Sequence, residues 1–144
     1  MRVYVDGVFD LYHRGHLESF KYIKSEEFIN LMNIKSDIYL IVGVVSDKDC
    51  QLYKRKPIIN ELDRLELIKY NKLVDEVIFP CPLFTTKDFI KKNKIDLVVH
   101  GFSDKNDFEN QKKYFKDAIE VGKFKQINYY DKTSTTKIIN KIKK

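Results

Sequence analysis

The sequence predicts an α/β fold: one open, doubly wound parallel sheet of about five strands with helices on both faces. Short apolar runs alternate with segments of helical periodicity along the whole chain. The apolar runs are rich in β-branched residues and show little alternation, as in strands covered on both faces of a parallel sheet. Because the 144 residues contain no repeat and no low-complexity linker, residues 1–144 are expected to form a single domain.

Five segments have the length and composition of strands. Val3–Val5 opens the chain, and Ile38–Val45 is the longest apolar run. The other three strands are expected at Val74–Phe79, Ile95–His100 and Phe124–Tyr129.

Five further segments are expected to be helical. The one at Glu61–Leu73 has apolar residues at helical spacing, and Asn60 before it is a suitable N-cap. The remaining helices are expected at His16–Phe28, Thr86–Asn93, Gln111–Val121 and Ser134–Lys143.

Composition and charge narrow the class of protein. No apolar run approaches the ~18 residues of a membrane span, and no leader is recognisable, so a cytoplasmic protein without stable membrane insertion is expected. Cys50 and Cys81 lack the spacing of a metal site or a disulfide framework, which suits free thiols. The net charge of +6 favours an anionic partner, but no stripe of aromatic and basic residues supports nucleic-acid binding.

The stretch VDGVFDLYHRGHLES follows the first predicted strand and contains His13 and His16. In open parallel sheets, ligands bind beyond the carboxyl ends of the strands. Gly7 lets the backbone approach a ligand, and Gly15 leaves space between the histidines. A helix that begins here directs free N–H groups and its positive end to the same place. The loop therefore predicts a phosphate site with two imidazole donors, as phosphoryl or nucleotidyl transfer requires.

The motif GVFDLYHRGH at Gly7–His16 resembles the first signature of the cytidylyltransferase family of nucleotidyltransferases. Ser134–Ile139, STTKII, resembles the second signature, which opens the last helix of the family's domain. Further matches in order and spacing are Leu40–Asp47, Tyr53–Lys54, Val74–Val77, Cys81–Pro82 and Thr85–Thr86. The resemblance covers the chain, is nearest to the phosphocholine and phosphoethanolamine cytidylyltransferases, and implies a Rossmann-like sheet of the nucleotidyltransferase type.

The resemblance implies a CTP-dependent transferase of phospholipid synthesis. In the family, the phosphate of an alcohol phosphate attacks the α-phosphate of CTP, pyrophosphate leaves and a CDP-alcohol forms. Mg²⁺ is implied with the nucleotide, held by phosphates and water rather than by a metal site of the protein. His13 and His16 are implied as donors to the α-phosphate, and Lys54 as a mobile charge between the two reacting phosphates.

The same motifs imply the nucleotide-binding residues. Ser134, Thr135 and Thr136 at a helix N-terminus suit the β- and γ-phosphates. The others are Gly7, Val8, Phe9, Gly15, Arg64, His100 and Gly101. Arg64 either holds phosphate or pairs with carboxylates on its own helix, and Asp10 orders the turn or a histidine.

Asp6 is the most informative residue for the identity of the second substrate. In the family's choline and ethanolamine enzymes an Asp at this position faces the cationic amine, whereas the glycerol-3-phosphate enzymes carry an aromatic residue. Phe84 and Phe115 are expected beside the amine. Leu83 stands where the choline enzymes have Trp and the ethanolamine enzymes usually have Tyr. The stretch Val99–Gly101 also resembles the ethanolamine enzymes. Together with the absence of Trp at position 83, it favours phosphoethanolamine over phosphocholine as the second substrate.

Three positions depart from the family pattern. An arginine that usually precedes Ser-Thr-Thr is absent, and Lys132 there cannot reproduce a bidentate arginine. Arg55 replaces a glycine, and Glu26–Ser36 is an extended helix or an inserted loop. Two alternatives therefore stay open: a degenerate nucleotide-binding or regulatory module without turnover, and a glycerol-3-phosphate cytidylyltransferase.

The resemblance also implies an assembly. Family members pair through the region around the first signature, so a homodimer is expected. Arg14, which points away from the histidine face, is the expected interface residue.

Overall fold

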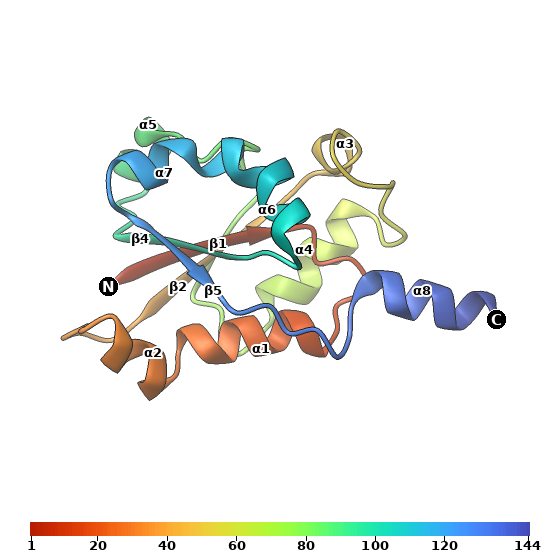
Figure 1. The fold of residues 1–144 in the computed structure, drawn as a ribbon, viewed down its shortest axis with the longest axis horizontal. Coiled ribbons are helices and arrows are strands. Elements are labelled where there is room, and N and C mark those ends of the chain that lie inside the picture. Colours follow the sequence, from red (N-terminus) through yellow and green to blue (C-terminus); the bar gives the residue numbers. More distant parts are fainter.

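The structure is a computed structural model that describes Met1–Lys144 and contains one five-stranded sheet, ordered β3-β2-β1-β4-β5 (Figure 1). The strands are β1 Arg2–Gly7, β2 Tyr39–Val44, β3 Glu76–Ile78, β4 Leu97–Gly101 and β5 Phe124–Ile127. All neighbouring strands run parallel. The predicted open parallel sheet is therefore confirmed, and each strand overlaps its predicted range.

Eight α-helices and one 3₁₀ turn connect and follow the strands. They are α1 Arg14–Ile23, α2 Glu26–Leu31, α3 Asp47–Cys50, α4 Glu61–Lys69, α5 Lys87–Lys92, α6 Lys105–Gln111, η1 Lys112–Phe115, α7 Lys116–Glu120 and α8 Thr135–Lys143. The predicted N-cap of α4 is confirmed, because the Asn60 side chain accepts a hydrogen bond from the N–H of Asp63 at 3.0 Å. No helix has the length and apolar character needed to cross a bilayer.

The first predicted helix is in fact two helices. Ser25 interrupts it, because its hydroxyl accepts a hydrogen bond from the N–H of Phe28 at 3.2 Å and so caps a new helix, α2. The segment Glu26–Ser36 contains α2 and the loop after it. Phe28 and Ile34 from this segment are buried in the core, so the segment contributes to the core of the fold.

The predicted helix at Gln111–Val121 is also wrong in its extent. Helix α6 begins earlier, where the carboxylate of Asp104 accepts a hydrogen bond from the N–H of Asp107 at 2.7 Å. A single apolar residue, Phe108, leaves α6 without the periodicity that reveals a helix in a sequence. The turn η1 then separates α6 from α7.

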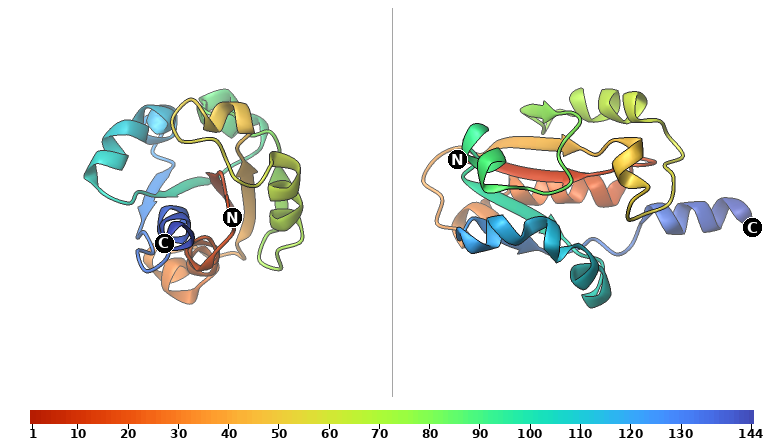
Figure 2. Two further views of the ribbon diagram at one scale, coloured as in Figure 1. Left: turned by 90° about the vertical axis from the view of Figure 1, so that its right-hand side faces the viewer. Right: turned by 90° about the horizontal axis from the view of Figure 1, so that it is seen from above.

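Two main clusters of buried apolar side chains, a larger and a smaller one, lie on opposite faces of the sheet, and helices cover both faces (Figure 2). A third cluster consists of four buried residues, Val8, Val45, Cys50 and Cys81. Side chains alternate along a strand, so Val3 and Val5 of β1 join the larger cluster and Tyr4 joins the smaller. Residues of α1, α2 and α4 complete the larger cluster. Residues of α5, η1 and α7 complete the smaller one, which leaves both faces covered.

The strand order creates a switch point at the centre of the sheet. The chain passes from β1 outward through β2 to β3 and then returns to add β4 on the other side of β1. Strands β1 and β4 are therefore neighbours whose connecting segments leave in opposite directions, which opens a crevice beyond their carboxyl ends. Helix α8 projects beyond this end of the sheet (Figures 1 and 2).

Candidate functional site

A cavity of about 610 Å³ lies at the switch point, at the ends of β1 and β4. The starts of α1 and α8 and the loop between α3 and α4 complete its walls. Its volume is typical of sites for cofactors and small molecules. The predicted site residues that line it are Asp6, Gly7, Val8, Phe9, His13, Gly15, His16, Lys54, His100, Gly101, Ser134, Thr135 and Thr136.

His13 and His16 lie ring against ring at the start of α1, with 3.9 Å between centroids. The N–H of Gly15 donates to Nδ1 of His13 at 3.0 Å, and the N–H of His13 donates to Nδ1 of His16 at 3.1 Å. Because Nδ1 accepts in both rings, each neutral imidazole carries its proton on Nε2. The backbone thereby orients two Nε2–H donors.

Burial lowers the pKa of both histidines. For His16, burial, the nearby His13 and the charge of Lys54 together lower the pKa to about 3. For His13, burial alone lowers the pKa from 6.5. Both rings are therefore neutral hydrogen-bond donors near pH 7.

Aromatic side chains hold His16 in place. Phe9 packs edge-on against its ring at 5.4 Å between centroids, and Tyr12 stacks on it at 5.6 Å. Phe9 has a φ of 57°, a left-handed conformation that costs a non-glycine residue ~1–2 kcal/mol and is offset by burial of its ring. A Cβ at residue 7 would lie 2.9 Å from that ring, which is why Gly7 is required there.

The start of α8 is tied to the histidine loop. The hydroxyl of Thr135 donates to the carbonyl of Asp10 at 3.0 Å and lies 3.4 Å from Nε2 of His13. Ser134 caps the helix by accepting from the N–H of Lys137 at 3.1 Å. The positive end of a nine-residue helix therefore borders the cavity beside the histidines.

Asp10 anchors a third loop at the same place. Its carboxylate accepts hydrogen bonds from the N–H groups of Ile58 and Ile59, each at 2.9 Å. The side chain is buried and both of its oxygens are used. Asp10 therefore orders the turn, one of its two predicted roles, and fixes the loop that carries Lys54.

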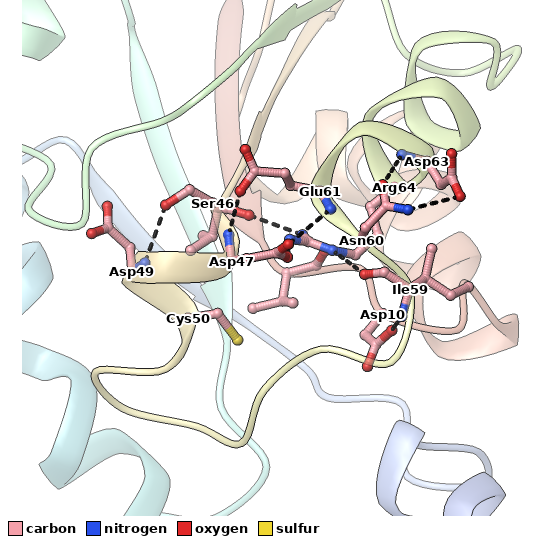
Figure 3. Close-up of polar contacts among 12 residues, drawn as sticks. Asp10, Ser46, Asp47, Asp49, Cys50, Ile59, Asn60, Glu61, Asp63 and Arg64 are labelled. Atoms are coloured by element: carbon pink, nitrogen blue, oxygen red, sulfur yellow. Dashed lines mark hydrogen bonds and ion pairs between the residues drawn. The ribbon is translucent and has the colours of Figure 1, made fainter.

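Arg64, which the sequence predicts as a nucleotide-binding residue, lies away from the cavity. It is completely buried and does not line the cavity. Its guanidinium donates to the carbonyls of Ile59 at 3.0 Å, Val8 at 2.6 Å and Val45 at 2.9 Å, and to the carboxylate of Asp47 at 2.6 Å (Figure 3). That carboxylate comes from α3, not from the helix of Arg64 itself. The residue joins loops and lines neither cavity.

A second, smaller cavity of about 30 Å³ adjoins the first. The two share Asp6, Lys54 and His100 among their lining residues. The remaining walls of the smaller cavity are Gly7, Val45, Tyr53, Leu83, Gln111, Tyr114 and Phe115. The carboxylate of Asp6 is nearly buried, and Nδ1 of His100 lies 3.4 Å from it without forming a hydrogen bond.

The structure places one of the two aromatic residues predicted beside the amine in the smaller cavity and the other outside both cavities. Phe115 lines the smaller cavity. Phe84 lines neither cavity, is half exposed and packs edge-on against Tyr114 at 5.0 Å. The sequence did not assign Tyr114 or Tyr53 to this cavity, although Tyr114 is adjacent to Phe115 and Tyr53 belongs to the Tyr53–Lys54 match with the family.

The segment between β5 and α8, and α8 itself, contribute further residues to the wall of the larger cavity that the sequence did not predict as site residues. Tyr129, Tyr130, Asp131 and Lys137 line the larger cavity, as does Arg55 from the loop between α3 and α4.

Comparison with known proteins identifies what the chain is similar to. A family model described as "Cytidylyltransferase-like" matches residues 4–141. Choline-phosphate cytidylyltransferase 2 of Arabidopsis thaliana is 36% identical over 147 residues, which are 100% of this chain and 45% of that protein. Ethanolamine-phosphate cytidylyltransferase of the same organism is 32% identical over 146 residues, 99% of this chain and 32% of that protein. This chain thus spans less than half the length of both relatives.

A solved structure has a similar fold. It is the lipopolysaccharide core biosynthesis protein from Thermoplasma volcanium GSS1, with a TM-score of 0.63 and 29% sequence identity. The match covers 91% of this chain and 98% of that one.

Loss of the Arg64 guanidinium should destabilise the fold strongly. Arg64→Met leaves three backbone carbonyls and Asp47 without their donor, and we expect the free energy of unfolding to fall by about 3–5 kcal/mol. Urea denaturation measures the change. Lys69→Met, on the exposed face of the same helix, should change it by less than about 0.5 kcal/mol. Equal midpoints for wild type and Arg64→Met would contradict the structural role.

The low pKa of His16 should make stability depend on pH. The folded-state pKa is about 3 and the ordinary value is 6.5, so between these values the unfolded chain binds more protons. This contribution is present above pH 6.5 and is lost as the pH falls toward 3. We expect the free energy of unfolding to decline from pH ~7 to ~4, and His16→Gln to reduce that decline. Identical slopes in urea denaturation would count against the assignment.

Proposed function

The chain belongs to the cytidylyltransferase-like family, and from this we propose that it transfers CMP from CTP to an amino-alcohol phosphate. A phosphate oxygen of the second substrate forms a bond to the α-phosphorus. The bond from that phosphorus to the bridging oxygen breaks, and pyrophosphate leaves with the electron pair. The observation that carries the proposal is the pair of adjoining cavities that share Lys54 and Asp6.

The larger cavity suits the nucleotide. The Nε2–H groups of His13 and His16 would donate to an oxygen of the α-phosphate, where negative charge develops in the transition state. The start of α8, with Ser134, Thr135 and Thr136, would hold the β- and γ-phosphates. These donors need no proton transfer, because the attacking phosphate oxygen is already an anion.

Lys54 lines both cavities and would contact both reacting phosphates. Its Nζ lies 5.5 Å from the centroid of the Tyr53 ring, on a loop rather than in a helix. A compact ammonium on a flexible stem can neutralise the two anions as they approach each other.

The smaller cavity suits the cationic end of the second substrate. The carboxylate of Asp6 is nearly buried and accepts no hydrogen bond from the nearby His100, and a buried carboxylate favours a ligand that brings a counter-charge. Tyr53, Tyr114 and Phe115 give this cavity aromatic walls, which attract cations. We therefore assign the amine of the substrate to Asp6.

The size of the smaller cavity favours phosphoethanolamine. The cavity volume of about 30 Å³ is small, and a primary ammonium needs less space than the trimethylammonium of phosphocholine.

Mg²⁺ is proposed to enter with the nucleotide. No group of three or more His, Cys, Asp or Glu side chains in the structure could hold a metal ion. The phosphates of CTP and water molecules would therefore supply most of its ligands, in keeping with the preference of Mg²⁺. When bound, the ion neutralises charge on the polyphosphate.

We also propose a cytoplasmic homodimer, as the family resemblance implies. Cys50 and Cys81 are free and buried, which suits a reducing compartment. Arg14 is exposed, lies outside both cavities and pairs with Glu18 on its own helix at 2.6 Å. Its place in a dimer interface stays a prediction.

Pyrophosphate release with CTP and Mg²⁺ tests the activity, with phosphoethanolamine, phosphocholine and glycerol-3-phosphate compared. Asp6→Asn should raise the KM for the amino-alcohol phosphate about tenfold or more, with little change for CTP, because it removes a buried charged contact. Preference for glycerol-3-phosphate would overturn the assignment of Asp6. CTP binding by folded protein without turnover would identify a degenerate module.

Enlarging the smaller cavity should change the choice of substrate. Leu83→Ala removes a wall of this cavity, so we expect the ratio of kcat/KM for phosphocholine to that for phosphoethanolamine to rise about tenfold. Leu67→Ala, at an exposed leucine of α4 outside both cavities, is the matched control and should leave the ratio unchanged. A wild-type preference for phosphocholine would contradict the size argument.

A further inference from the structure

The loop between α3 and α4 reaches across the larger cavity to the start of α8. Nη1 of Arg55 in this loop donates to the hydroxyl of Thr136 at 3.2 Å, although the two residues are 81 positions apart. Both line the cavity. Arg55 is the one arginine among the residues that line it.

Arg55 also has unused capacity to bind an anion. A guanidinium has five N–H groups, and the bond to Thr136 is the single side-chain hydrogen bond that Arg55 makes. No carboxylate forms an ion pair with it. It contrasts in this respect with Arg64, whose guanidinium is occupied by four protein oxygens.

The other cations near the start of α8 are less available. The ammonium of Lys137 donates to the carbonyl of Asp131. Lys132, the nearest cation before the Ser-Thr-Thr motif, does not line the cavity. Arg55 is therefore the cationic group best placed to bind phosphates at this helix N-terminus.

We propose that Arg55 binds the β- and γ-phosphates of the nucleotide and stabilises the departing pyrophosphate. The inference rests on the proposed function and adds a residue of this chain to it. Arginine presents two parallel N–H groups to a phosphate, and its hydrogen bond to Thr136 already holds it over the helix end where the polyphosphate would lie. The loop would thus carry a cation for each end of the reaction: Lys54 between the reacting phosphates and Arg55 on the leaving group.

Ligands that differ in their phosphates test this role. Isothermal titration calorimetry would compare CTP, CMP and inorganic pyrophosphate for wild type, Arg55→Ala and Arg55→Lys. We expect Arg55→Ala to weaken CTP and pyrophosphate about tenfold or more and CMP less than about twofold, because charge-assisted contacts to the outer phosphates are lost. Arg55→Lys should restore part of the affinity.

Lys56→Ala is the matched control, since Lys56 is adjacent, exposed and outside the cavity, and it should change none of the affinities more than about twofold. Unchanged binding of CTP and pyrophosphate by Arg55→Ala, or an equal loss for CTP and CMP, would overturn the role of Arg55. Wild-type protein that binds pyrophosphate but not CTP would contradict the proposed function, while the pyrophosphate comparison would still decide the role of Arg55.

Discussion

The geometry of the site depends on the buried guanidinium of Arg64. Loops beyond the strand ends have no ladder partners, so their carbonyl groups need other donors. Arg64 supplies them to Val8 after β1 and to Val45 after β2. It also pairs with Asp47 of α3 (Figure 3). Burial of such a cation costs several kcal/mol, which is offset here because four of its five N–H groups are bonded. Helix α4 thereby positions the histidine loop without contacting the cavity.

Asp10 connects the histidine loop to two further walls of the larger cavity, the loop between α3 and α4 and the start of α8. Its carboxylate holds Ile58 and Ile59, and its carbonyl holds Thr135, so three segments distant in sequence meet at one residue. The histidine donors are then oriented by backbone N–H groups, which cannot rotate away as side chains can. Their Nε2–H groups are fixed before any ligand binds, which is the preorganisation that transition-state stabilisation requires.

Local patterns account for what the sequence could predict. The sheet follows from apolar runs such as Ile38–Val45, and the helix start at Ser134 follows from a capping residue, because each signal lies within a few residues. The burial of Arg64 could not be predicted, since its partners lie 5 to 56 positions away. The sequence also could not predict that Tyr114, rather than Phe84, lines the cavity with Asp6, because the position of the Tyr114 ring depends on the turn η1.

The charges along the two cavities follow the order of charges in the proposed substrates. Asp6 and Lys54 line both cavities, whereas Arg55 lines the larger one alone, at the start of α8. An ammonium, a reacting phosphate and a polyphosphate have the complementary sequence of charges, so reversing either substrate would place like charges together. His13 and His16 are neutral because burial lowers their pKa, and in the proposed reaction they would donate to the α-phosphate, where charge develops only in the transition state. In the proposed complex, permanent charges of the substrates would thus meet permanent charges of the protein, and the developing charge would meet fixed neutral donors.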